Sequence, residues 1–150
     1  MFKELSSQVY VGFLFLTVAF AWWKGGRAER IGSLYNALMC IGAVQVHAAT
    51  RGVYGTVPIL VFDGLLATGF LFLAFRYASL WLAAAMVLQA LAFLIHASVL
   101  MGVLPEAGGR AHYYYYYMAM NLLGAGVMVV ILLGTAGAWY RRTHPSAAVA

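Results

Sequence analysis

The sequence has very few charged side chains. Its 150 residues include nine Lys and Arg and four Asp and Glu, so that 9% of the chain is charged and 65% is hydrophobic. A soluble globular domain carries about 25% charged residues. Because so few charges cannot cover a surface that faces water, most of the surface must face lipid. The composition therefore excludes an ordinary soluble domain and predicts a polytopic membrane protein.

Cysteine pairs and phosphate-binding motifs are also absent from the sequence. Cys40 is the only cysteine, which excludes an intrachain disulfide and CxxC chemistry. No GxGxxG or Walker pattern accompanies the glycines. The net charge of +5 comes from basic residues scattered between apolar runs, so we interpret them as topology markers and expect no nucleic-acid partner. No catalytic constellation can be assembled, and we expect a non-enzymatic protein.

Five apolar runs are long enough to cross a bilayer, whose core of ~30 Å needs about 17–25 helical residues. They cover residues 7–23, 31–50, 57–75, 78–102 and 113–139. The short connections between them make consecutive helices antiparallel neighbours. The N-terminal run imitates a signal peptide, but we expect it to be retained as the first helix. The sequence thus predicts an all-α fold, with one five-helix transmembrane domain over residues 1–150.

Basic residues fall unequally on the two sides of this predicted bundle. One side holds Lys24, Arg27, Arg30, Arg76, Arg141 and Arg142. The other side holds Lys3, Arg51 and Arg110. Since cytoplasmic loops carry the excess of Lys and Arg, we expect a cytoplasmic C-terminus and an N-terminus on the periplasmic or extracellular side.

Three of the runs place small and polar residues on one helical face, which in membranes usually turns toward other helices. These faces hold Ser33, Asn36, Cys40 and His47 in the second run, Ala85, Gln89, Ala92 and His96 in the fourth, and Tyr117, Asn121, Gly124 and Met128 in the fifth. With a rise of ~1.5 Å per residue, His47, Asp63, His96 and Asn121 all lie about 20–30 Å from the basic end. We therefore expect them to converge in the half of the bundle farther from the cytoplasm.

Five consecutive tyrosines, residues 113–117, open the fifth run. Consecutive residues of a helix point about 100° apart, so the five rings cannot line one pocket. We expect most of them to be anchors at the membrane interface, with one or two turned inward.

The convergent polar residues allow several hypotheses. His47 and His96 could be the axial ligands of a b-type haem, with Gln89 and Asn121 orienting the imidazoles. The same histidines with Asp63 could bind a metal ion. Asp63, the one acid inside a run, could instead relay protons with the histidines. The plainest alternative is that these side chains only hydrogen-bond neighbouring helices, at roughly 0.6 kcal/mol per bond.

A series of short elements extends over residues of about 20–135. It consists of RAERI at the start of the second run, followed by His47, Asp63, Arg76, Trp81, Gln89, His96 and Tyr113. In this order the chain is similar to a group of small inner-membrane proteins of alphaproteobacteria that has no assigned activity. The resemblance implies a bacterial inner membrane and a five-helix plan, and it implies no reaction.

These observations favour a subunit or accessory protein of a larger inner-membrane assembly, in the respiratory or electron-transfer class. Its expected partners are lipid and either other membrane subunits or further copies of the chain. The alternatives are a bis-histidine b-type cytochrome that transfers electrons near the periplasmic side, and a small proton or ion channel or transporter that uses Asp63.

Overall fold

The computed structural model describes residues 2–49, 57–103 and 110–144, and within these ranges the side chains of residues 2–7, 47 and 110–114 lie outside the description. The described chain is all helical. Its five helices are α1 (Phe2–Lys24), α2 (Arg27–Ala49), α3 (Val57–Tyr77), α4 (Leu80–Leu100) and α5 (Arg110–Thr143). The predicted all-α fold is confirmed.

Two of the connections are tight turns with identifiable caps. Between α1 and α2, the backbone N–H of Gly26 donates to the Glu29 carboxylate over 2.9 Å, which caps the N-terminus of α2. Between α3 and α4, Ala78 has a left-handed φ of 47° and Ser79 is the N-cap residue of α4. Each turn reverses the chain, so the helices on either side of it run antiparallel.

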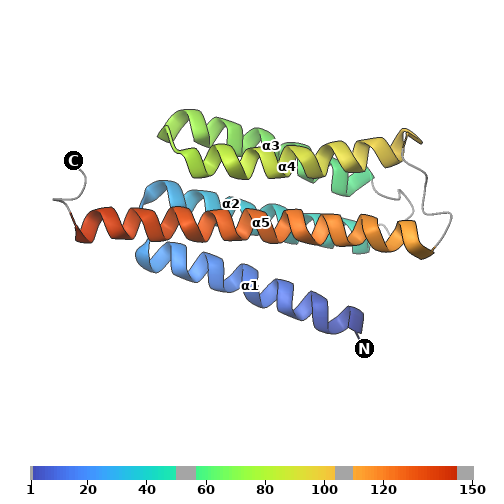
Figure 1. Ribbon diagram of the computed structural model, residues 1–150, viewed down its shortest axis with the longest axis horizontal. Coiled ribbons are helices and arrows are strands. Elements are labelled where there is room, and N and C mark those ends of the chain that lie inside the picture. The colour runs from blue at the N-terminus through green and yellow to red at the C-terminus, as the bar shows by residue number, and fades with distance from the viewer. Residues whose placement is uncertain (1, 50–56, 104–109, 145–150) are drawn as a thin grey trace.

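The helices follow one another around the bundle in chain order (Figure 1). α1 packs against α2 and α5, α3 packs against α2 and α4, and α5 closes the arrangement by contacting α4. α2 and α5 also touch each other across the bundle. The N-terminal end of α1 and the C-terminal end of α5 lie toward opposite ends of the long axis, and α1 leans away from α5 toward its own N-terminal end (Figure 1). An odd number of antiparallel helices produces this arrangement.

Among the described residues, three helical segments are long and apolar enough to cross a membrane: Val57–Tyr77, Leu80–Leu100 and Tyr115–Thr143. The described part of α1, Gln8–Lys24, is apolar but shorter. Large apolar side chains cover the outside of the bundle, as at Phe75 and Leu80, which are 80% and 90% exposed. Since soluble monomers rarely expose wide apolar surfaces, this surface suits lipid.

The core nearer the basic end is mainly apolar, and it also holds the buried polar side chains of Ser33, Asn36 and Thr135. Its main cluster joins α3, α4 and α5 and consists of Leu66, Phe70, Leu73, Leu82, Ala85, Val127 and Ile131. The Tyr35 ring of α2 meets Phe70 edge-on, with ring centroids 6.1 Å apart. A second cluster of Leu14, Ala37 and Met128 joins α1, α2 and α5. Together the two clusters bring all five helices into one packed body.

Trp81 connects three helices at the basic end. A Cβ on Gly32 of α2 would lie 2.7 Å from the Trp81 ring, and one on Gly134 of α5 would lie 2.4 Å from it, so both positions need glycine. The indole N–H donates to the buried Glu29 carboxylate over 3.1 Å. These contacts set how far α4 slides along α2 and α5, and so which residues meet near the other end.

Candidate functional site

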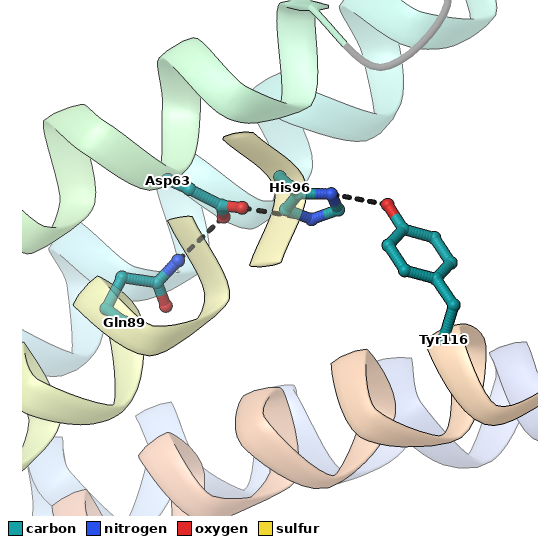
Figure 2. Close-up of polar contacts among 4 residues, drawn as sticks. All are labelled: Asp63, Gln89, His96 and Tyr116. Atoms are coloured by element: carbon teal, nitrogen blue, oxygen red, sulfur yellow. Dashed lines mark hydrogen bonds and ion pairs between the residues drawn. The ribbon is translucent and has the colours of Figure 1, made fainter. Parts of the chain in front are cut away.

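Asp63, His96 and Gln89 form a polar cluster where α3 and α4 run side by side (Figure 2). Asp63 and His96 are at similar distances in sequence from the turn at Ala78, so an antiparallel pair brings them to one level. His96 Nε2 lies 3.1 Å from Asp63 Oδ2. Gln89, two turns before His96 on the same face of α4, donates its amide N–H to Asp63 Oδ1 over 2.6 Å.

Tyr116 of α5 completes the cluster from the other side of the imidazole. Its hydroxyl lies 2.5 Å from His96 Nδ1, and the two rings meet edge-on with centroids 5.5 Å apart. Tyr116 is half-buried, whereas its neighbours Tyr115 and Tyr117 are exposed. Among the three tyrosines of the run 113–117 whose side chains are described, Tyr116 alone is turned inward, in agreement with the expectation of one or two.

The contact with Tyr116 determines which ring nitrogen of His96 carries the proton. When the Tyr116 hydroxyl donates to Nδ1, the proton of a neutral imidazole resides on Nε2, the nitrogen that faces Asp63. Nε2 lies within ion-pair distance of Asp63 Oδ2 without forming a hydrogen bond, and Oδ2 is buried with no hydrogen-bond partner among the described residues. Oδ2 thus remains an acceptor with an open lone pair.

A cavity of about 180 Å³ lies beside this cluster and is lined mainly by apolar side chains. Asp63, Gln89 and His96 contribute to its wall from α3 and α4. Tyr10 of α1 and Cys40 of α2 contribute a second group of polar side chains. All five helices therefore supply residues to one cavity.

The cavity reaches the outside of the bundle. Val44 of α2 belongs to its wall and is 67% exposed. Gly124 of α5 makes room for the Tyr10 ring, because a Cβ there would lie 2.7 Å from the Tyr10 hydroxyl. The opening lies at the side of the bundle, where the surrounding surface is apolar.

The structure brings three of the predicted site residues together and leaves Asn121 apart from them. The predicted face of α4 is confirmed, since Ala85, Gln89, Ala92 and His96 are all buried. Asn121 is exposed on α5 and lines a shallow surface pocket with Tyr117, away from the cluster. Its neighbour Met120 faces the cavity instead, and adjacent helical residues point about 100° apart. His47 lies in α2, and its side chain is outside the described residues.

The arrangement around His96 does not fit a haem. Both ring nitrogens already face oxygen atoms of Asp63 and Tyr116, so ligation of iron would require one contact to break. The cavity is also smaller than the ≈ 300–1,000 Å³ of sites for drug-sized ligands. Among the side chains that the structure describes, no three His, Cys, Asp or Glu lie close enough together to hold a metal ion. The haem and metal hypotheses, both of which include His47, stay predictions from the sequence, and the geometry favours hydrogen bonding by His96.

Sequence reasoning missed the roles of Tyr116, Tyr10 and Cys40. A signal for Tyr116 was present, because Tyr116, Met120 and Gly124 follow steps of four, and the last two line the cavity. We placed Tyr117 and Asn121 on the inner face of α5, where Tyr116 and Met120 lie instead, whereas Gly124 and Met128 of the same predicted face do turn inward. The apolar neighbours of Tyr10 concealed its role, and Cys40 was taken as a packing residue.

The chain was compared with protein-family models, curated proteins and solved structures, and none of them matches it. The similarity to the alphaproteobacterial group therefore stays a prediction, and functional conclusions depend on the site itself.

Proposed function

We propose that the protein crosses a bacterial inner membrane with all five helices and serves as a proton-relay subunit of a larger membrane assembly. The observation that carries this proposal is the unbroken series of contacts from Tyr116 through His96 to Asp63 inside the bundle. Ionisable side chains within a membrane are costly and usually mark proton or ion pathways.

The series can move a proton by exchange at the two nitrogens of one ring. His96 accepts a proton from the Tyr116 hydroxyl at Nδ1 and releases one from Nε2 to the Asp63 carboxylate. Tyr116 then recovers a proton from water at the membrane interface, so that one proton enters and one reaches Asp63. Gln89 keeps the carboxylate in position through Oδ1.

The relay ends inside the bundle. One and two turns beyond Asp63 toward the basic end, α3 presents Leu66 and Phe70 to the apolar core cluster. The members of that cluster are apolar side chains with no exchangeable proton, and among the described residues the hydrogen bonds of Asp63 lead only to Gln89. A proton that reaches Asp63 would then pass to a partner protein. This favours a subunit of an assembly over an independent channel.

Helix lengths and charges support five spans and the proposed orientation. α1 and α2 have 23 residues each, about 34 Å of helix, which matches a hydrocarbon core of ~30 Å. Lys24 lies against the Trp139 ring, and Arg142 donates to the Lys24 carbonyl oxygen, so the basic ends of α1 and α5 coincide. With this end in the cytoplasm, the relay lies in the periplasmic half of the membrane.

The relay can be tested by a rapid fall in pH on the Tyr116 side of proteoliposomes that hold the protein in one orientation. Protonation of Asp63 is followed by time-resolved infrared absorption of its carboxyl group, which is assigned by its loss in Asp63→Asn. We expect Tyr116→Phe to slow this protonation about tenfold or more, the effect of a barrier raised by ~1.4 kcal/mol or more. Tyr140→Phe, the same change on an exposed residue at the basic end, should leave the rate unchanged. An equal rate in Tyr116→Phe and wild type would contradict the relay.

The subunit role has a separate test. Purification in a mild detergent from native membranes should retain another membrane protein in a fixed ratio. Recovery of a monomer alone, with undiminished stability, would contradict the proposed assembly.

A further inference from the structure

We infer that the cavity beside Asp63 binds a hydroxylated aromatic ring, the hydroquinone type of head group, which reaches it from the lipid. This inference names a ligand for the cavity beside the proposed proton relay, and it rests on that proposal for the membrane location of the site. The ligand donates a hydrogen bond to Asp63 and receives no proton from the relay. The binding itself depends on the shape and chemistry of the cavity.

The size of the cavity selects a single ring. Its volume is about 180 Å³. An apolar protein cavity of about 150 Å³ accepts benzene. One six-membered ring with small substituents therefore fits, whereas a nucleotide or a haem does not.

The composition of the cavity lining suits an amphipathic ring. Phe62, Leu66, Met39 and Met120 present apolar surface, and the polar atoms are confined to two groups of side chains. Binding sites for small molecules have this composition, a mostly apolar wall with a few placed polar groups.

The open acceptor on Asp63 selects a ligand that donates a hydrogen bond. Asp63 lines the cavity, and its Oδ2 is buried with no hydrogen-bond partner among the described residues, so that beside the His96 Nε2 contact at 3.1 Å it can accept a further donor. A buried acceptor left unpaired costs about 1–3 kcal/mol, which a donated ligand hydroxyl would remove. Tyr10 and Cys40 offer a second polar contact for a ring that carries two hydroxyls. A quinone, whose oxygens only accept, lacks the donor that Oδ2 requires.

The side opening indicates where the ligand comes from. Exposed Val44 belongs to the cavity wall, and it lies on α2 about 20 Å from Arg30 at the basic end. At that depth the opening faces hydrocarbon and not water. The ligand is therefore a lipid-soluble molecule, for which a hydroxylated ring with an alkyl tail is the matching chemistry.

The test uses a hydroquinone with a decyl tail, its quinone form and its dimethyl ether, each added to the purified protein in detergent. We expect the hydroquinone to raise the unfolding temperature, as any ligand of the folded state does, and the other two compounds to raise it much less. This series needs no substitution. Equal shifts for the hydroquinone and the dimethyl ether, or no shift for either, would overturn the inference.

Two variants locate the binding. Ala43→Phe places a ring in the cavity wall and should abolish the shift, while Ala84→Phe, on the exposed side of α4, should retain it. Bound hydroquinone should also slow alkylation of Cys40 by N-ethylmaleimide, about tenfold at about nine times Kd, because the free fraction falls as 1/(1 + [L]/Kd). A shift that survives in Ala43→Phe would show binding elsewhere and would overturn the inference.

The relay and the binding site can fail independently. Tyr116→Phe should lose rapid protonation of Asp63 and keep the hydroquinone shift, because Tyr116 is not part of the described cavity lining. A normal relay without any hydroquinone shift removes the ligand and leaves the relay. A rise in unfolding temperature with hydroquinone, together with no rapid protonation of Asp63, removes the relay and leaves the ligand.

Discussion

The packing of Trp81 against Gly134 can be tested by adding one methyl group. In Gly134→Ala the new Cβ would lie 2.4 Å from Cγ, 2.6 Å from Cδ1 and 2.7 Å from Cδ2 of Trp81. Ordinary contacts between carbon atoms are about 3.5–4.0 Å, so the ring or α5 must move by about 1 Å. The ring has little freedom to move, because Gly32 approaches it from α2 and Glu29 holds its N–H.

The expected loss of stability follows from two opposing effects. Overpacking a filled core costs typically 1–3 kcal/mol, and replacing glycine by alanine within a helix recovers up to about 1 kcal/mol. We expect Gly134→Ala to lower the free energy of unfolding by about 1–2 kcal/mol, measured by titration with sodium dodecyl sulfate in mixed micelles.

Gly137→Ala is the matched control for this experiment. It makes the same change one turn later on α5, where the nearest atom to the new Cβ is Arg141 Nη1 at 3.6 Å, an ordinary contact. This variant should be neutral or more stable by up to about 1 kcal/mol. If the two variants have equal stability, α4 and α5 do not pack as described, and the register that brings His96 to Tyr116 is wrong.

Three further substitutions test separate parts of the structure by the same titration. Ala78→Gly should stabilise the protein by about 0.5–1 kcal/mol. Glycine adopts the left-handed φ of 47° at this position without the ~1–2 kcal/mol penalty of other residues. A loss of stability in this variant would refute the turn. Gln89→Leu removes the hydrogen bond to Asp63 Oδ1 and should lower the free energy of unfolding by about 1–2 kcal/mol. The control Gln45→Leu, on the exposed face of α2, should leave it unchanged. Equal effects of the two substitutions would contradict the cluster. Trp81→Phe removes the indole N–H that donates to buried Glu29 and should lower the free energy of unfolding by about 1.5–3 kcal/mol. The control Trp23→Phe, whose indole is exposed, should lose no stability. An unchanged stability in Trp81→Phe would show that Glu29 does not accept this hydrogen bond.

Much of the candidate site could be predicted from periodicity alone. The spacing of Gln89 and His96 on α4 identified a buried face, and the helical rise placed Asp63 at the level of His96. Both inferences use distances within one helix or across one tight turn, where the geometry of the α-helix leaves little choice. The same approach succeeded only in part for α5, where Gly124 and Met128 face inward but Tyr117 and Asn121 do not. An error of one residue in the inner face rotates the helix by about 100°, which exchanged Asn121 for Met120 and Tyr117 for Tyr116.

By itself the sequence determined the class of the protein. With 9% charged residues and long apolar runs, the chain must satisfy its backbone hydrogen bonds within helices and turn its apolar side chains toward lipid. Only the tertiary structure decided which of the five tyrosines meets His96. It also decided that Tyr10 and Cys40 share a cavity with Asp63. Those contacts depend on how far each helix slides and rotates against its neighbours. Single glycines such as Gly134 and Gly124 set that fit through the rings they admit, and their effect appears only when the helices are packed together.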